Sequence, residues 1–215
     1  MVRGAHLIAT VLAILTGGCA PWVERIYRPE APNGRLLETY CGYESGPGRW
    51  DRIELNEHGL SLRVRAARID NGIAFEVRFL IPEGITARLA STTFTISPVG
   101  NASSVDVRVE EIRYSLPGVF YQWQSMPVDA RMDGKSVQAS RGKSKGTYRQ
   151  IYSMSFAIQG FDGNPSFILR LPLIEVNGKS RKFSEVRFAP ATETYIAGYC
   201  AGVGEIIQNF FPNPT

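Results

Sequence analysis

The chain has 215 residues, of which 44% are hydrophobic and 20% are charged, and its net charge is +4. This composition is that of an ordinary globular protein, so it excludes an intrinsically disordered or fibrous chain. The small positive charge is spread along the sequence and gives no support to nucleic-acid binding.

The first eighteen residues have the layout of a signal peptide. Arg3 precedes an apolar run at residues 7–15, and small residues at 16–18 lead to Cys19. The apolar run has the length of a secretory signal and is short for a membrane span. The layout therefore predicts a signal peptide rather than a spanning helix.

Gly17, Gly18 and Cys19 resemble the lipobox of bacterial lipoproteins, although that family usually has leucine where this chain has Thr16. In the family, the cysteine receives a diacylglyceryl group, the signal peptide is cleaved just before it, and the new amine is acylated, for example with palmitate. The resemblance implies that Cys19 carries three acyl chains, which anchor a protein stably where one would not. Ala20 stands where an aspartate is associated with inner-membrane retention, which implies the outer membrane and its periplasmic face.

Two other interpretations of this segment remain open. Residues 7–23 could form an uncleaved membrane anchor, although the glycines and Pro21 disfavour a helix there. Ordinary secretory cleavage after Ala20 would place Pro21 at the cut.

Cys41 and Cys200 are the two other cysteines of the chain. An even number of cysteines in an oxidising compartment predicts a disulfide, which here would close a loop of about 160 residues. A metal or redox pair is the alternative, but the sequence has no CxxC and, after residue 18, one histidine, His58. The sequence predicts no metal site and no cofactor.

Residues 19–35 contain three prolines and no periodic pattern, which predicts a lipidated N-terminus and flexible tether. Residues 36–204 then form a single domain rich in alternating, strand-like patterns. Residues 205–211 have apolar side chains at helical spacing, so a short helix is expected within the tail at 205–215. Many short strands without a long helix predict an all-β fold, an antiparallel β-sandwich or partly open barrel.

Residues 59–81 contain the clearest hairpin. Asn71-Gly72 predicts a two-residue type I′ turn. The resulting register places apolar side chains on one face and charged side chains on the other. The apolar pairs are Ala66 with Val77, Val64 with Phe79, and Leu62 with Ile81; the charged residues are Arg63, Arg65, Glu76 and Arg78, with Arg65 opposite Arg78.

Further strands are expected at 86–96, 105–114, 119–124, 148–159, 167–176 and 183–188. Pro172 predicts an edge strand or a bulge. A four-residue loop at 177–180 would pair Ile174 with Phe183 and Glu175 with Lys182.

A basic segment, "SRGKSKGTYR", carries Arg141, Lys143, Lys145 and Arg149. It could approach anionic lipid headgroups or lipopolysaccharide phosphates. A solvated loop tip is the simpler interpretation and the one we favour.

Tyr121 and Trp123 alternate with two glutamines. Aromatic rings beside amides can stack on a sugar and bind its hydroxyls, which suggests a glycan site. Alternation also predicts a buried strand face, and we favour that interpretation.

His58 lies in "NEHGL", which reads as a turn, and no G-x-S-x-G nucleophile motif is present. The leading hypothesis is a lipid-anchored outer-membrane β-domain that acts as a binding or envelope-assembly module. It would contact the membrane through its lipid, and envelope proteins, glycan or lipopolysaccharide through surface loops. The alternatives are a cell-envelope hydrolase using His58 or distant carboxylates, and a structural component of a larger envelope machine.

Overall fold

The structure, a computed structural model, describes residues 21–39, 49–100, 103–115, 123–141, 144–160 and 165–196. These residues are all-β, as predicted, with three antiparallel sheets packed as a sandwich and no closed barrel in the described part. Tyr27–Leu37 and Trp50–Pro190 belong to one compact unit. The described residues at 21–26, 38–39, 49 and 191–196 belong to a second unit. The predicted signal peptide, the three cysteines and the predicted C-terminal helix lie outside the described residues.

The seven-stranded sheet forms one layer of the sandwich. In spatial order its strands are β10 (Trp123–Pro127), β9 (Glu111–Ser115), β14 (Ile151–Gln159), β5 (Gly72–Leu80), β4 (Leu60–Ile69), β3 (Arg49–Glu57) and β2 (Gly34–Thr39).

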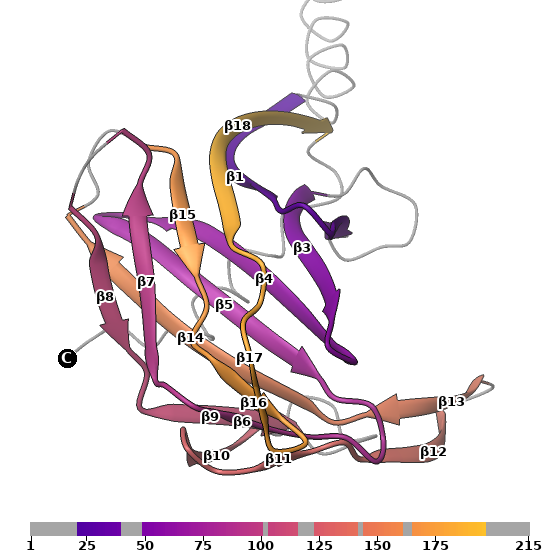
Figure 1. Ribbon diagram of the computed structural model, residues 1–215. Helices are drawn as coiled ribbons and strands as arrows, with labels where there is room; N and C mark the ends of the chain where they lie inside the picture. The colour runs from indigo at the N-terminus through magenta and orange to yellow at the C-terminus, as the bar shows by residue number, and fades with distance from the viewer. Residues whose placement is uncertain are drawn as a thin grey trace, which may run out of the picture. The chain divides into compact units, whose positions relative to one another are not determined.

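The other two sheets of the sandwich have five and four strands. The five-stranded sheet has the order β1 (Pro21–Glu30), β18 (Val186–Ile196), β15 (Phe167–Arg170), β7 (Thr93–Pro98) and β8 (Val105–Arg108). The four-stranded sheet has the order β11 (Met132–Asp133), β6 (Thr86–Leu89), β16 (Ile174–Val176) and β17 (Lys179–Arg181). In Figure 1, β4, β5 and β14 run diagonally behind β7 and β15.

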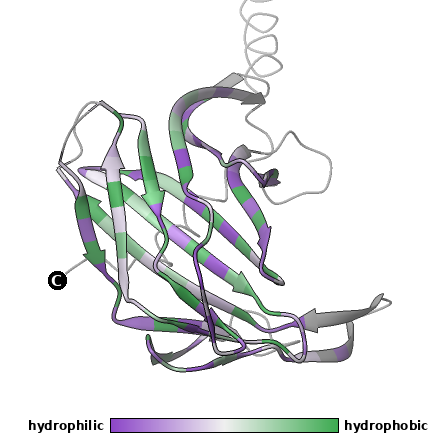
Figure 2. Ribbon diagram, in the orientation of Figure 1, coloured by the Kyte–Doolittle hydropathy of each residue, from purple (hydrophilic) through white to green (hydrophobic). Residues whose placement is uncertain are grey.

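The core is built around two cross-strand phenylalanine pairs. Phe75 of β5 lies opposite Phe156 of β14, and Phe167 of β15 lies opposite Phe188 of β18. The ring centroids are 5.1 Å apart within each pair, and Phe75 meets Phe167 edge-on at 5.4 Å. All four rings are buried, so each sheet supplies one stacked pair and the pairs interlock between the layers. Figure 2 shows the matching alternation of hydrophobic and hydrophilic residues along β4 and β5.

Three segments predicted as single strands each break where the chain passes from one sheet to another. The breaks are at 90–92, 109–110 and 171–173, between β6 and β7, β8 and β9, and β15 and β16. The Ala90 amide donates to the Leu173 carbonyl at 2.8 Å, and the Val109 amide to the Thr92 carbonyl at 3.0 Å. Pro172 lies in such a break, rather than in an edge strand or bulge, where its missing amide costs no ladder bond.

The β4–β5 hairpin has the predicted faces but not the predicted register. Ile69 pairs with Gly72, so the turn residues are Asp70 and Asn71, and neither has a positive φ. The apolar pairs are Ala66 with Phe75, Val64 with Val77, and Leu62 with Phe79, and Arg63 rather than Arg65 lies opposite Arg78. A shift of two residues keeps every side chain on its predicted face.

Gly72 is explained by its contact with the neighbouring strand β14 rather than by the turn. A Cβ at this position would lie 1.9 Å from the carbonyl oxygen of Ile158 in β14. Glycine is therefore required here by the close approach of two backbones.

Two other hairpins have the two-residue turns with two positive φ values that define type I′. Glu57 pairs with Leu60 around His58 (φ 54°) and Gly59 (φ 81°). Val176 pairs with Lys179 around Asn177 (φ 48°) and Gly178 (φ 77°). The predicted four-residue loop at 177–180 is therefore wrong: Ile174 pairs with Arg181 and Glu175 with Ser180.

The described part of the predicted tether also differs from the expectation. Strand β1 covers Pro21–Glu30, and β2 begins at Gly34. Tyr27 is buried, with its ring centroid 5.0 Å from that of Phe167. Burial of this one aromatic ring joins the segment to the core, which proline content alone did not reveal.

Replacing Gly72 with alanine should destabilise the protein by about 3 kcal/mol, because the backbones of β5 and β14 would have to separate. The comparison variant is Gly160→Ala, where no non-neighbouring atom lies within 4 Å of the new Cβ. Its cost is the left-handed backbone (φ 76°), about 1–2 kcal/mol. Urea denaturation measures both losses, and a smaller loss at position 72 than at position 160 would contradict this register.

Candidate functional site

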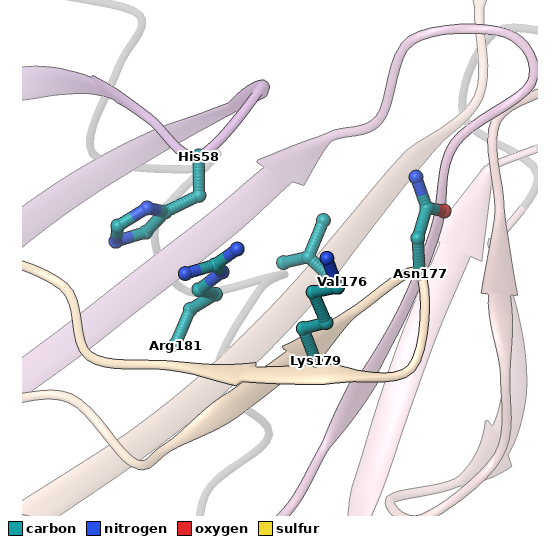
Figure 3. A pocket seen from close by; sticks show the side chains of 5 residues that line it. All are labelled: His58, Val176, Asn177, Lys179 and Arg181. Atoms are coloured by element: carbon teal, nitrogen blue, oxygen red, sulfur yellow. The ribbon is translucent and has the colours of Figure 1, made fainter.

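A surface pocket of about 380 Å³ lies between the two type I′ hairpins. It is lined by His58, Val176, Asn177, Lys179 and Arg181. Figure 3 shows His58 on the β3–β4 turn and the other four residues on the β16–β17 hairpin, with Arg181 and Lys179 pointing toward the His58 side. The two non-glycine residues with positive φ among those described, His58 and Asn177, both line this pocket.

The register of β17 places both pocket cations on one face of the strand. Lys179 lies opposite Val176, and Arg181 opposite Ile174, and both of these partners are buried. Directly opposite residues share a face, so Lys179 and Arg181 project from the core-facing side of an edge strand. Both cations remain exposed, while their partners Val176 and Ile174 are covered by the core.

His58 fastens its turn to the segment that follows β17. Its Nε2 lies 2.9 Å from the carbonyl oxygen of Lys182, so Nε2 carries the proton and donates. Its ring meets buried Phe183 edge-on, with centroids 5.2 Å apart. Glu57 Oε2 accepts from the Ser184 amide at 3.0 Å. The prediction of a turn at His58 is confirmed, and His58 and Glu57 together hold residues 182–184.

Asn177 is oriented by a bond on the other side of its hairpin. Its Oδ1 accepts from the Thr86 amide at 2.9 Å and from the Thr86 hydroxyl at 3.4 Å. The two N–H groups of its side-chain amide remain for the pocket.

The pocket is rich in donors and positively charged. Neither Lys179 nor Arg181 forms an ion pair with a described carboxylate, whereas Arg88 nearby pairs with Glu175 at 2.7 Å. Among the described lining residues there is no carboxylate, hydroxyl or thiol. The neutral His58 ring offers one acceptor, Nδ1, against the many N–H groups of lysine, arginine and asparagine. This inventory suits an anion.

A second polar surface covers the outer face of the seven-stranded sheet. Glu54, whose side chain is 6% exposed, accepts from Arg35 at 2.5 Å and from Arg63 at 2.9 Å. Burial acts to raise the pKa of Glu54, but the two arginines outweigh it and lower the pKa to about 2. Further ion pairs of this face join Arg65 to Asp51, Arg78 to Glu76 and Arg52 to Glu76.

Arg52 lies within this ion-pair network with its side chain 17% exposed. Burial lowers its pKa to about 10, as does the nearby Arg78, against the opposing effect of Glu76. Because each of these three carboxylates forms an ion pair with at least one arginine, we assign the network a structural rather than a ligand-binding role.

Trp123 lies on the outer face of the seven-stranded sheet, at the end of β10. It pairs with Ser115, and the guanidinium carbon of Arg113 lies 5.9 Å from its ring centroid. The ring is partly exposed, so the predicted buried face is wrong for Trp123. Gln124 lies on the opposite face, where its Oε1 accepts from the Tyr114 hydroxyl. Tyr121 lies outside the described residues.

The predicted basic loop contains a hairpin. Strands β12 (Ser136–Arg141) and β13 (Ser144–Arg149) pair antiparallel, which places Arg141 and Lys145 within strands. Arg149 ends β13 and is exposed, and Lys143 lies outside the described residues. Arg149, whose side chain the structure describes, is not among the residues that line the pocket.

The pocket residues other than His58 were missed by the sequence analysis. An Asn-Gly turn followed by alternating cations, "NGKSR", was the available signal, because it predicts a type I′ hairpin with both cations on one face. Within the described ranges there is no group of three metal-ligating residues, and no helix long and apolar enough to cross a membrane.

The described geometry defines an all-β sandwich with a cationic pocket at the edge of one sheet. No protein-family model matches the sequence, and no curated protein is significantly similar to it.

Replacing His58 with asparagine should destabilise the protein by about 1–2 kcal/mol. Asparagine adopts positive φ readily, so the turn is kept while the bond to Lys182 and the ring contact with Phe183 are lost. Thermal and urea denaturation measure the change. An unchanged free energy of unfolding would show that His58 does not fasten the two segments.

The free energy of unfolding should decrease as the pH is lowered from about 4.5 to about 2, and protonation of Glu54 should account for part of the decrease. A carboxyl whose pKa is lowered on folding stabilises the protein above its unfolded pKa and loses that contribution as pH falls through the folded value. Glu54→Gln should be less stable than the parent at pH 7 and should show a shallower decline over this range.

The matched control for this titration is Glu110→Gln, at an exposed position without an ion pair to the described residues. Urea denaturation from pH 7 to pH 2 compares the two. An acid decline as steep in Glu54→Gln as in the parent would refute the role of Glu54.

Proposed function

We propose that the chain is a lipid-anchored β-sandwich on the periplasmic face of a bacterial outer membrane, where it acts as a binding module. Two features support this proposal. The resemblance of residues 17–19 to a lipobox supports the anchor, and the cationic pocket supports binding. In this proposal the partner carries negative charge.

The contacts of His58 favour binding over hydrolysis. Its Nε2 donates a hydrogen bond to the Lys182 carbonyl, and its ring packs edge-on against Phe183. A hydrolase of the Ser-His-Asp type needs a nucleophile within hydrogen-bond reach of the imidazole and a carboxylate that orients the ring. Among the described residues that line the pocket, none could be that nucleophile. The contacts of His58 instead suit a residue that holds a ligand-facing turn in place.

The proposed anchor is Cys19, with three acyl chains in place of residues 1–18. Several acyl chains give a stable attachment without a spanning helix. The proposed disulfide between Cys41 and Cys200 would further stabilise the domain in an oxidising periplasm.

Metabolic labelling with a palmitate analogue tests the anchor. The parent chain should take up the label and sediment with outer membranes in a density gradient, whereas Cys19→Ser should take up none. Cys200→Ser is the matched control: it removes a cysteine and should keep the label. Label retained in Cys19→Ser, or absent from the parent, would overturn the proposed anchor.

A further inference from the structure

We propose that the pocket lined by His58, Asn177, Lys179 and Arg181 binds a phosphate group carried on a larger polar molecule. This inference rests on the proposed binding function and names the chemical class of its ligand. It follows from the charge of the pocket, the fixed orientation of its neutral side chains, and its size.

The charge comes from the two cations of β17. Lys179 and Arg181 are two residues apart on one strand and face the same side, opposite Val176 and Ile174. Neither forms an ion pair with a described carboxylate, whereas the neighbouring Arg88 and Lys182 do. Arginine binds phosphate oxygens with its planar fork, and lysine adds a compact charge.

The neutral side chains of the pocket are held by bonds that leave donors available. Asn177 uses its oxygen on Thr86, so its N–H groups remain. His58 donates from Nε2 to the Lys182 carbonyl, which fixes the position of its ring at the pocket. Because both residues lie in fixed type I′ turns, little conformational entropy would be lost on binding.

The pocket has room for more than the phosphate group itself. A volume of about 380 Å³ lies at the lower end of the range for small-molecule sites. It is larger than a single phosphate requires. A sugar or a lipid headgroup attached to the phosphate would occupy the remainder.

Lys179 and Arg181 could have another role, because charged residues on an edge strand prevent edge-to-edge aggregation. This use requires charge of either sign, whereas phosphate binding requires positive charge. Reversing the charge of both residues separates the two uses, because the edge stays protected and the phosphate is repelled.

The test variant is therefore Lys179→Glu combined with Arg181→Glu. Its matched control is Arg108→Glu combined with Arg187→Glu, which makes the same change in net charge at two exposed positions of the five-stranded sheet. Circular dichroism confirms that each variant is folded. Both are purified as the full lipidated chain in a nonionic detergent and phosphate-free buffer.

Isothermal titration calorimetry measures binding of three probes: inorganic phosphate, glucose 6-phosphate and dihexanoyl phosphatidic acid. We expect the parent and the control to bind at least one probe saturably, and the test variant to bind it at least tenfold more weakly. Preference for glucose 6-phosphate would support a soluble or glycan-borne phosphate, and preference for the short-chain lipid would support a headgroup.

Two results would overturn the inference. One is no saturable binding of any probe by the parent chain. The other is an equal loss in the test variant and the control, which would indicate a nonspecific effect of net charge. Neither result bears on the palmitate label at Cys19, so failure of the phosphate site and failure of the proposed anchor are separately observable.

Discussion

The packing of Phe75, Phe156, Phe167 and Phe188 is the interaction on which the rest of the structure depends. Each sheet contributes a cross-strand pair, and the two pairs meet edge-on in the interior. Burial of four large aromatic side chains supplies much of the apolar contact between the layers. The five-stranded layer then extends into the four-stranded one through breaks at 90–92 and 171–173, which places β17 at a free edge.

The charged side chains at the edge strand β17 and on the outer face of the seven-stranded sheet differ in their ion pairing. On the outer face, each carboxylate forms an ion pair with an arginine of its own or a neighbouring strand, as Glu54 does with Arg63. At the edge, Lys179 and Arg181 line the pocket beside His58 and form no ion pair with a described carboxylate. The ion pairs of the outer face stabilise the fold, whereas the two pocket cations, which form no ion pair with a described carboxylate, are available to an anion.

Alternation along the strands predicted the sandwich and the two faces of the β4–β5 hairpin, because each depends on local periodicity alone. The register was missed because Gly72 is selected by the backbone of β14, a contact that no local pattern records. The breaks between sheets were missed because the alternation continues through them. The pocket was missed because His58 and the β17 hairpin are brought together by the fold alone; His58 is bonded to Lys182, 124 residues away.

Anchoring of this sandwich through Cys19 is tested most directly by the intact mass of the protein extracted from its native membrane, before and after reduction and alkylation. We predict a mass equal to residues 19–215 plus three acyl chains, with Cys41 and Cys200 alkylated only after reduction. A mass that includes residues 1–18, or a chain cleaved elsewhere with a free Cys19, would contradict the anchor. Alkylation of Cys41 and Cys200 without reduction would contradict the disulfide.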